Sequence, residues 1–339
     1  MNILASETSS VRASTDAWQS ILKAAFRSPE ELAAELQLPT SMAITARGAN
    51  DQFRLFAPQP FVDLMERGRT DDPLLLQIWP APAELQIHPD EKRDPVGDAQ
   101  AHVMPGVLQK YSGRALLVLT GACAVHCRYC FRRNWSYDES PGSLGQWEPS
   151  LAAIEADPSI HEVILSGGDP LMWDDDKLAR LVERIEQMQH VSRLRIHTRM
   201  PVVLPQRVTP ELLSALSTSS LRTVVVVHAN HRRELSLLVQ QAMERMAAQG
   251  FMLLNQSVLL AGVNDNANEL VQLSERLVEC CVLPYYLHQL DRVTGSSHFE
   301  VSIDRGRALI AEMRRRLPGY LVPRYVRETP GEQAKSVIA

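Results

Sequence analysis

The segment Ala115-Leu-Leu-Val-Leu-Thr120 runs directly into Gly121-Ala-Cys123-Ala-Val-His-Cys127-Arg-Tyr-Cys130, so an apolar run leads into a C-x₃-C-x₂-C pattern. Cysteine thiolates hold iron–sulfur clusters, and a four-iron cluster ligated at only three corners leaves one iron open to another ligand. A structural zinc site would fill four positions, yet the other cysteines, Cys280 and Cys281, are adjacent and form no second C-x₂-C pair. The pattern therefore favours an open cluster, with zinc or coincidence as alternatives. Cys280 and Cys281 are expected to pack as small hydrophobic residues.

Strand-like and helix-like patterns alternate from this segment onward. The strand-like runs are Ala115–Thr120, His161–Ser166, Leu194–Thr198, Thr223–His228, Met252–Leu259 and Val282–Leu287. The helical patterns are Lys177–Met188, Glu211–Leu216, Glu234–Ala248, Asn268–Glu279 and Ile303–Leu317. Such alternation predicts an α/β fold with parallel strands, which are apolar throughout because helices cover both faces. Six units are too few for an eight-stranded barrel, so a partial (β/α)6 barrel or an open doubly wound sheet remains.

The first hundred residues have a different character. Ala17–Phe26 and Pro29–Leu36 read as amphipathic helices, the second capped by Ser28. Asp72–Gln100 is rich in proline and acidic residues and predicts an irregular connection. We therefore expect an N-terminal helical region over 1–105, a barrel over 106–290 and a short C-terminal segment over 291–339.

Composition limits the possible partners and compartment. The chain has 339 residues and a formal net charge of −5, which gives no electrostatic reason to bind nucleic acid or an anionic membrane. No apolar run approaches the roughly 20 residues that span a bilayer. The first residues, Met1–Glu7, lack a basic segment followed by an apolar core, so no signal peptide is expected. Five cysteines, three of them clustered, fit a reducing compartment, and we expect a cytoplasmic protein.

Polar groups follow or interrupt several predicted strands. Ser166-Gly-Gly-Asp169-Pro170 ends the second strand, and its glycines either let a ligand approach the backbone or simply form a capped turn. His228 and Asn230 follow the fourth strand, and Asn255-Gln256-Ser257 lies within the fifth. These side chains either satisfy neighbouring backbone groups or face the barrel mouth and hold a cofactor.

The cysteine pattern resembles the signature of the radical S-adenosylmethionine (SAM) enzymes. The resemblance implies a [4Fe-4S] cluster on Cys123, Cys127 and Cys130, with SAM on the open iron, and it favours the partial barrel. It also implies that Gly167, Gly168 and Asp169 receive the amino group of SAM. His228 and Gln256 are the further candidates for cofactor binding.

A closer resemblance is to the lysine 2,3-aminomutase family. It is carried by Val107–Arg133, Ser166–Leu171, Pro201–Thr209, Asn255–Asp265 and Pro284–Asp291, and it covers roughly residues 15 to 338. The family is a group of isomerases that use pyridoxal 5′-phosphate (PLP) as a second cofactor and move the α-amino group of lysine to the β carbon.

The family's PLP-binding lysine lies in a glycine-rich motif near the C-terminus. The matching run is Thr329-Pro-Gly-Glu-Gln-Ala-Lys335, which implies Lys335 as the catalytic, PLP-binding residue although most of the glycines are replaced. The same resemblance assigns Tyr111 and Arg114 to the PLP phosphate. From the residues alone, a lysine so close to the end would be read as a solvated side chain.

The resemblance also assigns the groups that bind substrate. Arg132 matches the arginine that holds the lysine carboxylate, a role that suits a guanidinium fork. Asp291 and Glu328 match the two acids that hold the distal ammonium, with glutamate at 328 where the family normally has aspartate. Two acids argue against an acidic side chain on the substrate, because like charges repel. The pattern predicts free L-lysine as substrate.

The chain resembles the short-form aminomutases of this family, which supply (R)-β-lysine for modification of elongation factor P (EF-P). This resemblance implies a functional link to an EF-P lysyl ligase and a reductant protein for the cluster. Two alternatives are a radical SAM aminomutase for another amino acid and a non-catalytic iron–sulfur or zinc protein.

Overall fold

The computed structural model describes residues 17–86, 88–137, 141–217 and 220–339. The segment considered above as a possible signal peptide falls within 1–16 and lies outside the described residues. The described strands form one open sheet in sequence order, β1 to β10. Neighbouring strands from β3 to β9 pair in parallel, whereas β1–β2, β2–β3 and β9–β10 pair antiparallel. The partial-barrel prediction is confirmed: the parallel sheet curves but does not close.

The elements have the following bounds. The strands are β1 His102–Met104, β2 Val107–Leu108, β3 Arg114–Val118, β4 Glu162–Ser166, β5 Arg193–Thr198, β6 Arg222–Val227, β7 Met252–Val258, β8 Leu283–His288, β9 Arg324–Arg327 and β10 Ser336–Val337. The α-helices, after a first one over 17–23, are α2 Pro29–Glu35, α3 Thr40–Gln52, α4 Gln59–Val62, α5 Pro73–Leu76, α6 Leu144–Ala156, α7 Asp175–Glu186, α8 Met200–Val203, α9 Pro210–Leu216, α10 Leu237–Ala248, α11 Ala267–Glu279 and α12 Ile303–Arg316. The short 3₁₀ helices are Pro82–Leu85, Ala99–Ala101, Pro170–Met172, Pro205–Arg207, Arg232–Glu234, Ser297–Phe299 and Gly319–Leu321.

All six predicted strands are present, each within two residues of its expected ends. Helix α10 begins three residues later than predicted because Ser236 caps it, accepting from the backbone N–H of Val239. Glu234, expected inside that helix, instead accepts from the backbone N–H groups of Asn230 and His231. Helices α3 and α6 were not predicted, and α6 contains Pro149, which obscures a helical pattern.

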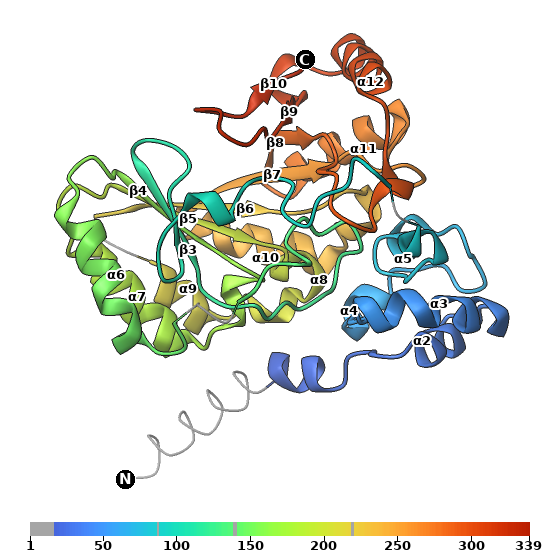
Figure 1. Cartoon of the computed structure of the whole chain (residues 1–339), viewed down its shortest axis with the longest axis horizontal. Coiled ribbons are helices and arrows are strands. Elements are labelled where there is room, and N and C mark those ends of the chain that lie inside the picture. The colour runs from blue at the N-terminus through green and yellow to red at the C-terminus, as the bar shows by residue number, and fades with distance from the viewer. Residues whose placement is uncertain (1–16, 87, 138–140, 218–219) are drawn as a thin grey trace.

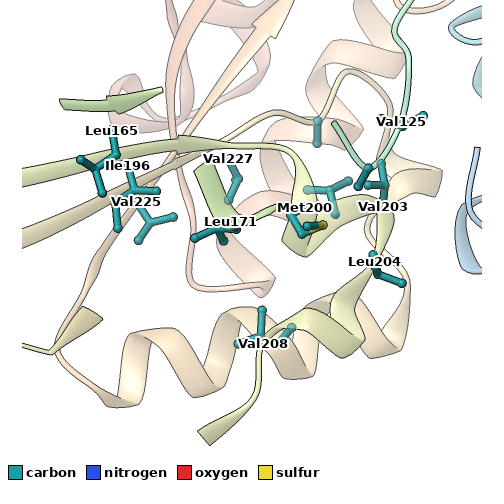
Figure 2. Packing of buried hydrophobic residues seen from close by; sticks show 14 of the residues in the cluster. Val125, Leu165, Leu171, Ile196, Met200, Val203, Leu204, Val208, Val225 and Val227 are labelled. Carbon is teal, nitrogen blue, oxygen red and sulfur yellow. The ribbon is translucent and has the colours of Figure 1, made fainter. Parts of the chain in front are cut away.

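Side chains that alternate along the strands pack against the helices and form the main core. Leu165, Ile196 and Val225 lie beside one another on neighbouring strands of this layer (Figure 2). Each is fully or almost fully buried, and burial of such a side chain stabilises the fold by about 1.5–3 kcal/mol. The opposite face of each strand is free to carry polar groups into the barrel.

The described segments before and after the barrel pack at separate places. Helices α2 to α5 form a layer beside the barrel, whereas β9 and β10 extend the sheet past β8 and α12 lies near them (Figure 1). The predicted Ser28 cap is confirmed, because its side chain accepts from the backbone N–H of Glu30 and Glu31. The three-domain division stays a prediction. One sheet takes strands from all three predicted regions.

The two cysteines outside the cluster motif differ from each other. Cys280 is fully buried in the main core, as expected. The expectation for Cys281 was wrong, because its side chain is exposed and its backbone has a φ of 60°. It follows the C-cap of α11, where the chain turns sharply into β8, and a left-handed residue at this position sends the side chain outward.

No helix in the described parts of the chain is both long and apolar enough to cross a membrane.

Candidate active site

The cysteine loop follows β3 and is held by the loop that follows β4. Gly168 N–H donates to Thr120 O at 2.6 Å, and Asp169 N–H donates to Ala122 O at 2.8 Å. A Cβ on Gly168 would lie 2.4 Å from Ala122 O, and Gly167 adopts a φ of +124°. Both glycines are therefore required for two backbones to approach this closely. The glycine motif at least shapes the cysteine loop, and its direct contact with SAM stays a prediction.

Three arginines tie the cysteine loop to the N-terminal connection. Arg128 donates to Glu84 at 2.6 and 2.8 Å, and both side chains are completely buried. Arg133 also donates to Glu84, at 2.9 Å. Arg132 donates to Asp98 at 2.6 Å. Although no regular element spans most of the connection, it supplies the buried acids that neutralise the loop.

The three loop thiols act on one another electrostatically. Burial and the neighbouring Cys130 and Cys127 raise the pKa of the Cys123 thiol well above its usual value. Burial and Cys127 likewise raise the pKa of Cys130 to about 11. Yet no three His, Cys, Asp or Glu side chains among the described residues are grouped to hold one metal ion. Three thiols on one loop are the number that ligates three corners of a four-iron cluster.

Asp169 lies buried beneath this loop and braces the end of β5. Its carboxylate accepts from the Thr198 hydroxyl at 2.7 and 2.9 Å and from the backbone N–H of Arg199 and Met200 at 2.8 and 3.0 Å. Burial raises the pKa of Asp169, and these hydrogen bonds oppose the rise. The carboxylate thus has a structural role that the sequence did not indicate.

Charges of alternating sign connect the predicted PLP lysine to the predicted substrate arginine. Lys335 forms an ion pair with Glu328, and Glu328 lies 3.4 Å from Lys110. Lys110 contacts Asp98 at 2.6 Å, and Asp98 in turn contacts Arg132. The structure therefore brings Lys335, Glu328 and Arg132 into one continuous network. Sequence reasoning missed Lys110 and Asp98, because neither belongs to a motif or a periodic pattern.

The other residues predicted for PLP and for the substrate ammonium adjoin this network. Tyr111 donates its hydroxyl to Glu328 at 2.8 Å, and the guanidinium of Arg114 lies over the Tyr111 ring. Burial would raise the pKa of Glu328, but Lys335 and other donors hold it at about 2. Burial raises the pKa of Asp291 to about 7; nearby Lys335 opposes the rise and Glu328 adds to it. One acid is thus firmly ionised and the other titrates near neutrality.

Several polar side chains lie inside the sheet's curve. The ring of His228 lies 3.1 Å from the Gln256 amide, measured between Nε2 atoms, so these two predicted cofactor residues meet. Burial lowers the pKa of His228 to about 3, and burial together with Lys335 does the same for His288. The buried Nε2 atoms of His197 and His288 have no hydrogen-bond partner among the described residues. Neutral rings with unused polar atoms are suited to bind a ligand.

The remaining polar strand-end residues satisfy the protein itself. The Asn255 amide exchanges hydrogen bonds with the backbone of Ala229, and Ser257 donates to Ala229 O. Asn230 accepts from the backbone of Val258 and donates to the side chains of Gln77 and Tyr129. These three residues therefore bind polar groups of the protein itself, whereas His228 and Gln256 face the barrel interior.

The sequence is similar to known enzymes along nearly its whole length. Residues 117–273 match the Radical SAM superfamily. The chain is 44% identical over 322 residues to L-lysine 2,3-aminomutase from Haemophilus influenzae, covering 95% of each chain. It is 43% identical over 324 residues to the Escherichia coli L-lysine 2,3-aminomutase, covering 95% of this chain and 94% of the relative. The Buchnera aphidicola L-lysine 2,3-aminomutase is 40% identical over 325 residues, with 95% of each chain covered.

The chain belongs to the lysine 2,3-aminomutase family. It is therefore an isomerase of the radical SAM type, and membership implies a [4Fe-4S] cluster, SAM and PLP. The residues present fit these groups. Three thiols share one loop, two buried imidazole nitrogens have no hydrogen-bond partner in the described part of the chain, and Lys335 and Tyr111 both contact Glu328. Of the residues predicted by resemblance to this aminomutase family, Arg132 lies on the cysteine loop, Asp291 follows β8, and Glu328 and Lys335 lie between β9 and β10.

Proposed function

We propose that this enzyme is an L-lysine 2,3-aminomutase that converts (S)-α-lysine to (R)-β-lysine. The observation that carries the proposal is the charge network, with Arg132 at one end and the acid Glu328 beside Lys335 at the other. A free amino acid with a cationic side chain needs such a pair of opposite charges. The names of the relatives support the same substrate.

Each end of the substrate has a proposed partner. Arg132 binds the carboxylate through its terminal nitrogens, because its Nε is already occupied by Asp98 and Nη1 also reaches the Ser166 hydroxyl at 3.0 Å. Asp291 and Glu328 receive the distal ammonium. Because Glu328 is ionised at any physiological pH, it attracts a cation whether or not Asp291 carries a proton.

The chain's own residues hold the cofactors in this proposal. Cys123, Cys127 and Cys130 ligate the cluster, and Gly167, Gly168, Asp169, His228 and Gln256 border SAM. Lys335 binds PLP covalently, with Tyr111 and Arg114 at its phosphate. When bound, the cluster and SAM supply the radical that removes the β hydrogen, and PLP carries the migrating nitrogen. The sheet interior excludes water and orients these groups.

The cellular role proposed is the supply of β-lysine for modification of EF-P. It requires a reductant protein for the cluster and a ligase that attaches the product. The match to aminomutases over 95% of this chain and 94–95% of the relatives' own lengths supports this role. A cytoplasmic location belongs to the same proposal, since cluster thiols need a reducing compartment.

The test is anaerobic incubation of the reconstituted enzyme with lysine, SAM, PLP and a reductant, followed by chiral analysis of the amino acids. We expect (R)-β-lysine from the wild type and none from Lys335→Ala or Cys127→Ala. Glutamate and ornithine in place of lysine serve as alternative substrates. Clear turnover of either one without β-lysine formation would replace the lysine assignment, and a cluster-loaded protein that turns over no amino acid would favour a non-catalytic role.

A further inference from the structure

A buried arginine from outside the cysteine loop reaches one of the loop thiols. Arg199 directly follows β5, and its Nη1 lies 2.7 Å from Cys127 Sγ. Its side chain is only 8% exposed. Neither the cysteine motif nor the helix and strand pattern indicates this contact, which joins residues 72 positions apart.

Three parts of the molecule hold the guanidinium in place. Its Nη2 donates to Gln77 Oε1 at 2.6 Å and to Glu234 Oε2 at 2.8 Å. It also lies over the rings of Phe61 and Tyr129. The backbone N–H of Arg199 donates to Asp169 at 2.8 Å. The guanidinium thus has a single fixed orientation, in which Nη2 binds the two acceptors and Nη1 is directed at the sulfur.

The acceptors are themselves fixed. Glu234 is completely buried, and its other oxygen accepts from the backbone of Asn230 and His231 and from the Gln77 amide. Both oxygens of Glu234 and both terminal nitrogens of Arg199 are thus engaged, and a network of this kind resists rearrangement. The ion pair with Glu234 by itself balances the charge of Arg199. The contact of Nη1 with Cys127 is therefore not required for charge balance.

We propose that Arg199 is a tuning residue that raises the reduction potential of the cluster through its hydrogen bond to the Cys127 sulfur. Reduction adds negative charge to the cluster and its thiolates. A charge-assisted donor to a ligand sulfur stabilises this state more than the oxidised one, and hydrogen bonds to sulfur are among the factors that set such potentials. Reduction of the cluster by the donor protein thereby becomes easier.

This inference rests on Cys127 being a cluster ligand, but not on lysine being the substrate. Its test therefore uses the cluster potential, which a wrong substrate assignment would leave unchanged. Iron content in Cys127→Ala checks the ligand assignment separately: an intact cluster with wild-type potential in that variant overturns the inference.

The variant Arg199→Met with Glu234→Gln removes the donor and keeps the buried site neutral. The matched control is Arg207→Met with Asp175→Asn, because Arg207 is also fully buried and contacts Asp175 at 2.7 Å, while its other hydrogen bonds go to backbone oxygens. Both proteins and the wild type are reconstituted, assayed for iron and sulfide, and titrated anaerobically while the cluster's electron paramagnetic resonance signal is recorded.

We expect the ratio of reduced to oxidised cluster at a fixed potential to fall about tenfold in the Arg199 variant, a shift of about 59 mV for one electron. The control should keep the wild-type potential. Arg199→Lys should fall between them, because an ammonium cannot serve Glu234 and the sulfur together as the guanidinium fork does. An unchanged potential in the fully loaded double variant overturns the proposal. If that variant retains no iron, Arg199→Lys decides, and a wild-type potential there overturns it.

Discussion

Arg132 donates its Nε to Asp98 across 2.6 Å, so the arginine proposed to bind the substrate is oriented by a buried acid from the N-terminal connection. Asp98 also contacts Lys110 at 2.6 Å. Burial would raise the pKa of Asp98, but Arg132 and Lys110 hold it below its usual value. Nη1 of Arg132 also donates to the Ser166 hydroxyl at 3.0 Å, and in our proposal the terminal nitrogens meet the substrate carboxylate. Asp98 therefore acts as a positioning group and does not block the site.

Replacement of Asp98 should weaken substrate binding. Asp98→Asn keeps the shape but loses the charge, so Arg132 is held less firmly; a hydrogen bond between charged groups contributes about 1.5–3 kcal/mol. We expect the KM for lysine to rise about tenfold or more, which corresponds to about 1.4 kcal/mol. Steady-state kinetics measure this, with Glu148→Gln as control because its ion pair with Arg184 is exposed. A KM equal to that of the wild type would show that Arg132 needs no support from Asp98.

Removal of the Glu328 charge should change how readily Lys335 binds PLP. The carboxylate forms an ion pair with the Lys335 ammonium, and this pair must break before the amine can attack PLP. In Glu328→Gln we expect PLP, followed by its visible absorbance, to attach at a lower PLP concentration than in the wild type. The control is Glu332→Gln, which affects an exposed acid in the same hairpin whose partner is Ser336. Identical PLP titrations for Glu328→Gln and the wild type would contradict the role of the ion pair.

Asp291 should make lysine binding depend on pH near neutrality. Because its pKa is about 7, the carboxyl is largely protonated at pH 6 and ionised at pH 8. An ionised Asp291 attracts the substrate ammonium, so the KM for lysine should fall as the pH rises across this range. The dependence should be much flatter in Asp291→Asn, which never ionises. An equally steep KM profile in the variant would assign the titration to another group.

The same shift predicts an effect on stability in the absence of ligands. The folded protein keeps the Asp291 proton up to about pH 7, whereas in the unfolded chain the carboxyl loses it near its ordinary pKa of 3.8. Between these values the folded state binds more protons, so this residue's contribution to stability falls as the pH rises. Asp291→Asn should gain thermal stability relative to the wild type at pH 8 and little at pH 4. Melting curves at both pH values test this, and a constant difference would contradict it.

The sequence predicted the barrel well because its signals are local. Strand β6 is a run of valines, and α7 and α11 each place leucines at helical spacing behind an acid or amide cap. The start of α10 shows the limit, because the Ser236 cap sets where that helix begins, while Glu234, which periodicity placed inside it, binds the backbone of Asn230 and His231.

The site residues outside the motifs could not be predicted in this way. Glu84 and Asp98 belong to a proline-rich connection without helical or strand periodicity, and their arginine partners lie 34 to 49 residues away. Arg199 likewise meets Cys127 across 72 positions of the sequence. Long-range pairs of this kind leave no periodic trace, because the partner positions are fixed by the tertiary structure.

Gly168 should be needed for cluster retention. An alanine Cβ at this position would lie 2.4 Å from Ala122 O, which is backbone and cannot move without shifting the cysteine loop. Gly168→Ala should therefore lose most of its iron on reconstitution. Gly145→Ala is the matched control, because nothing lies within 4 Å of its added Cβ at the start of α6. That variant should hold wild-type iron, with stability changed by no more than about 1 kcal/mol. Full iron content in Gly168→Ala would show that the two loops can separate without loss of the site.

Glu84 should stabilise the whole protein through the cysteine loop. It is the shared acid for Arg128 and Arg133, and loss of its charge would leave two buried guanidinium groups without a counter-charge. Breaking a buried pair on one side costs about 3–5 kcal/mol. We expect Glu84→Gln to lower the free energy of unfolding by about that amount in urea titrations of the apoprotein. Glu35→Gln is the control, because its pair with Arg67 is largely exposed and such pairs contribute at most about 1 kcal/mol. A loss in Glu84→Gln no larger than in the control would mean that the loop arginines are hydrated when the acid is removed, and that the connection does not anchor the loop.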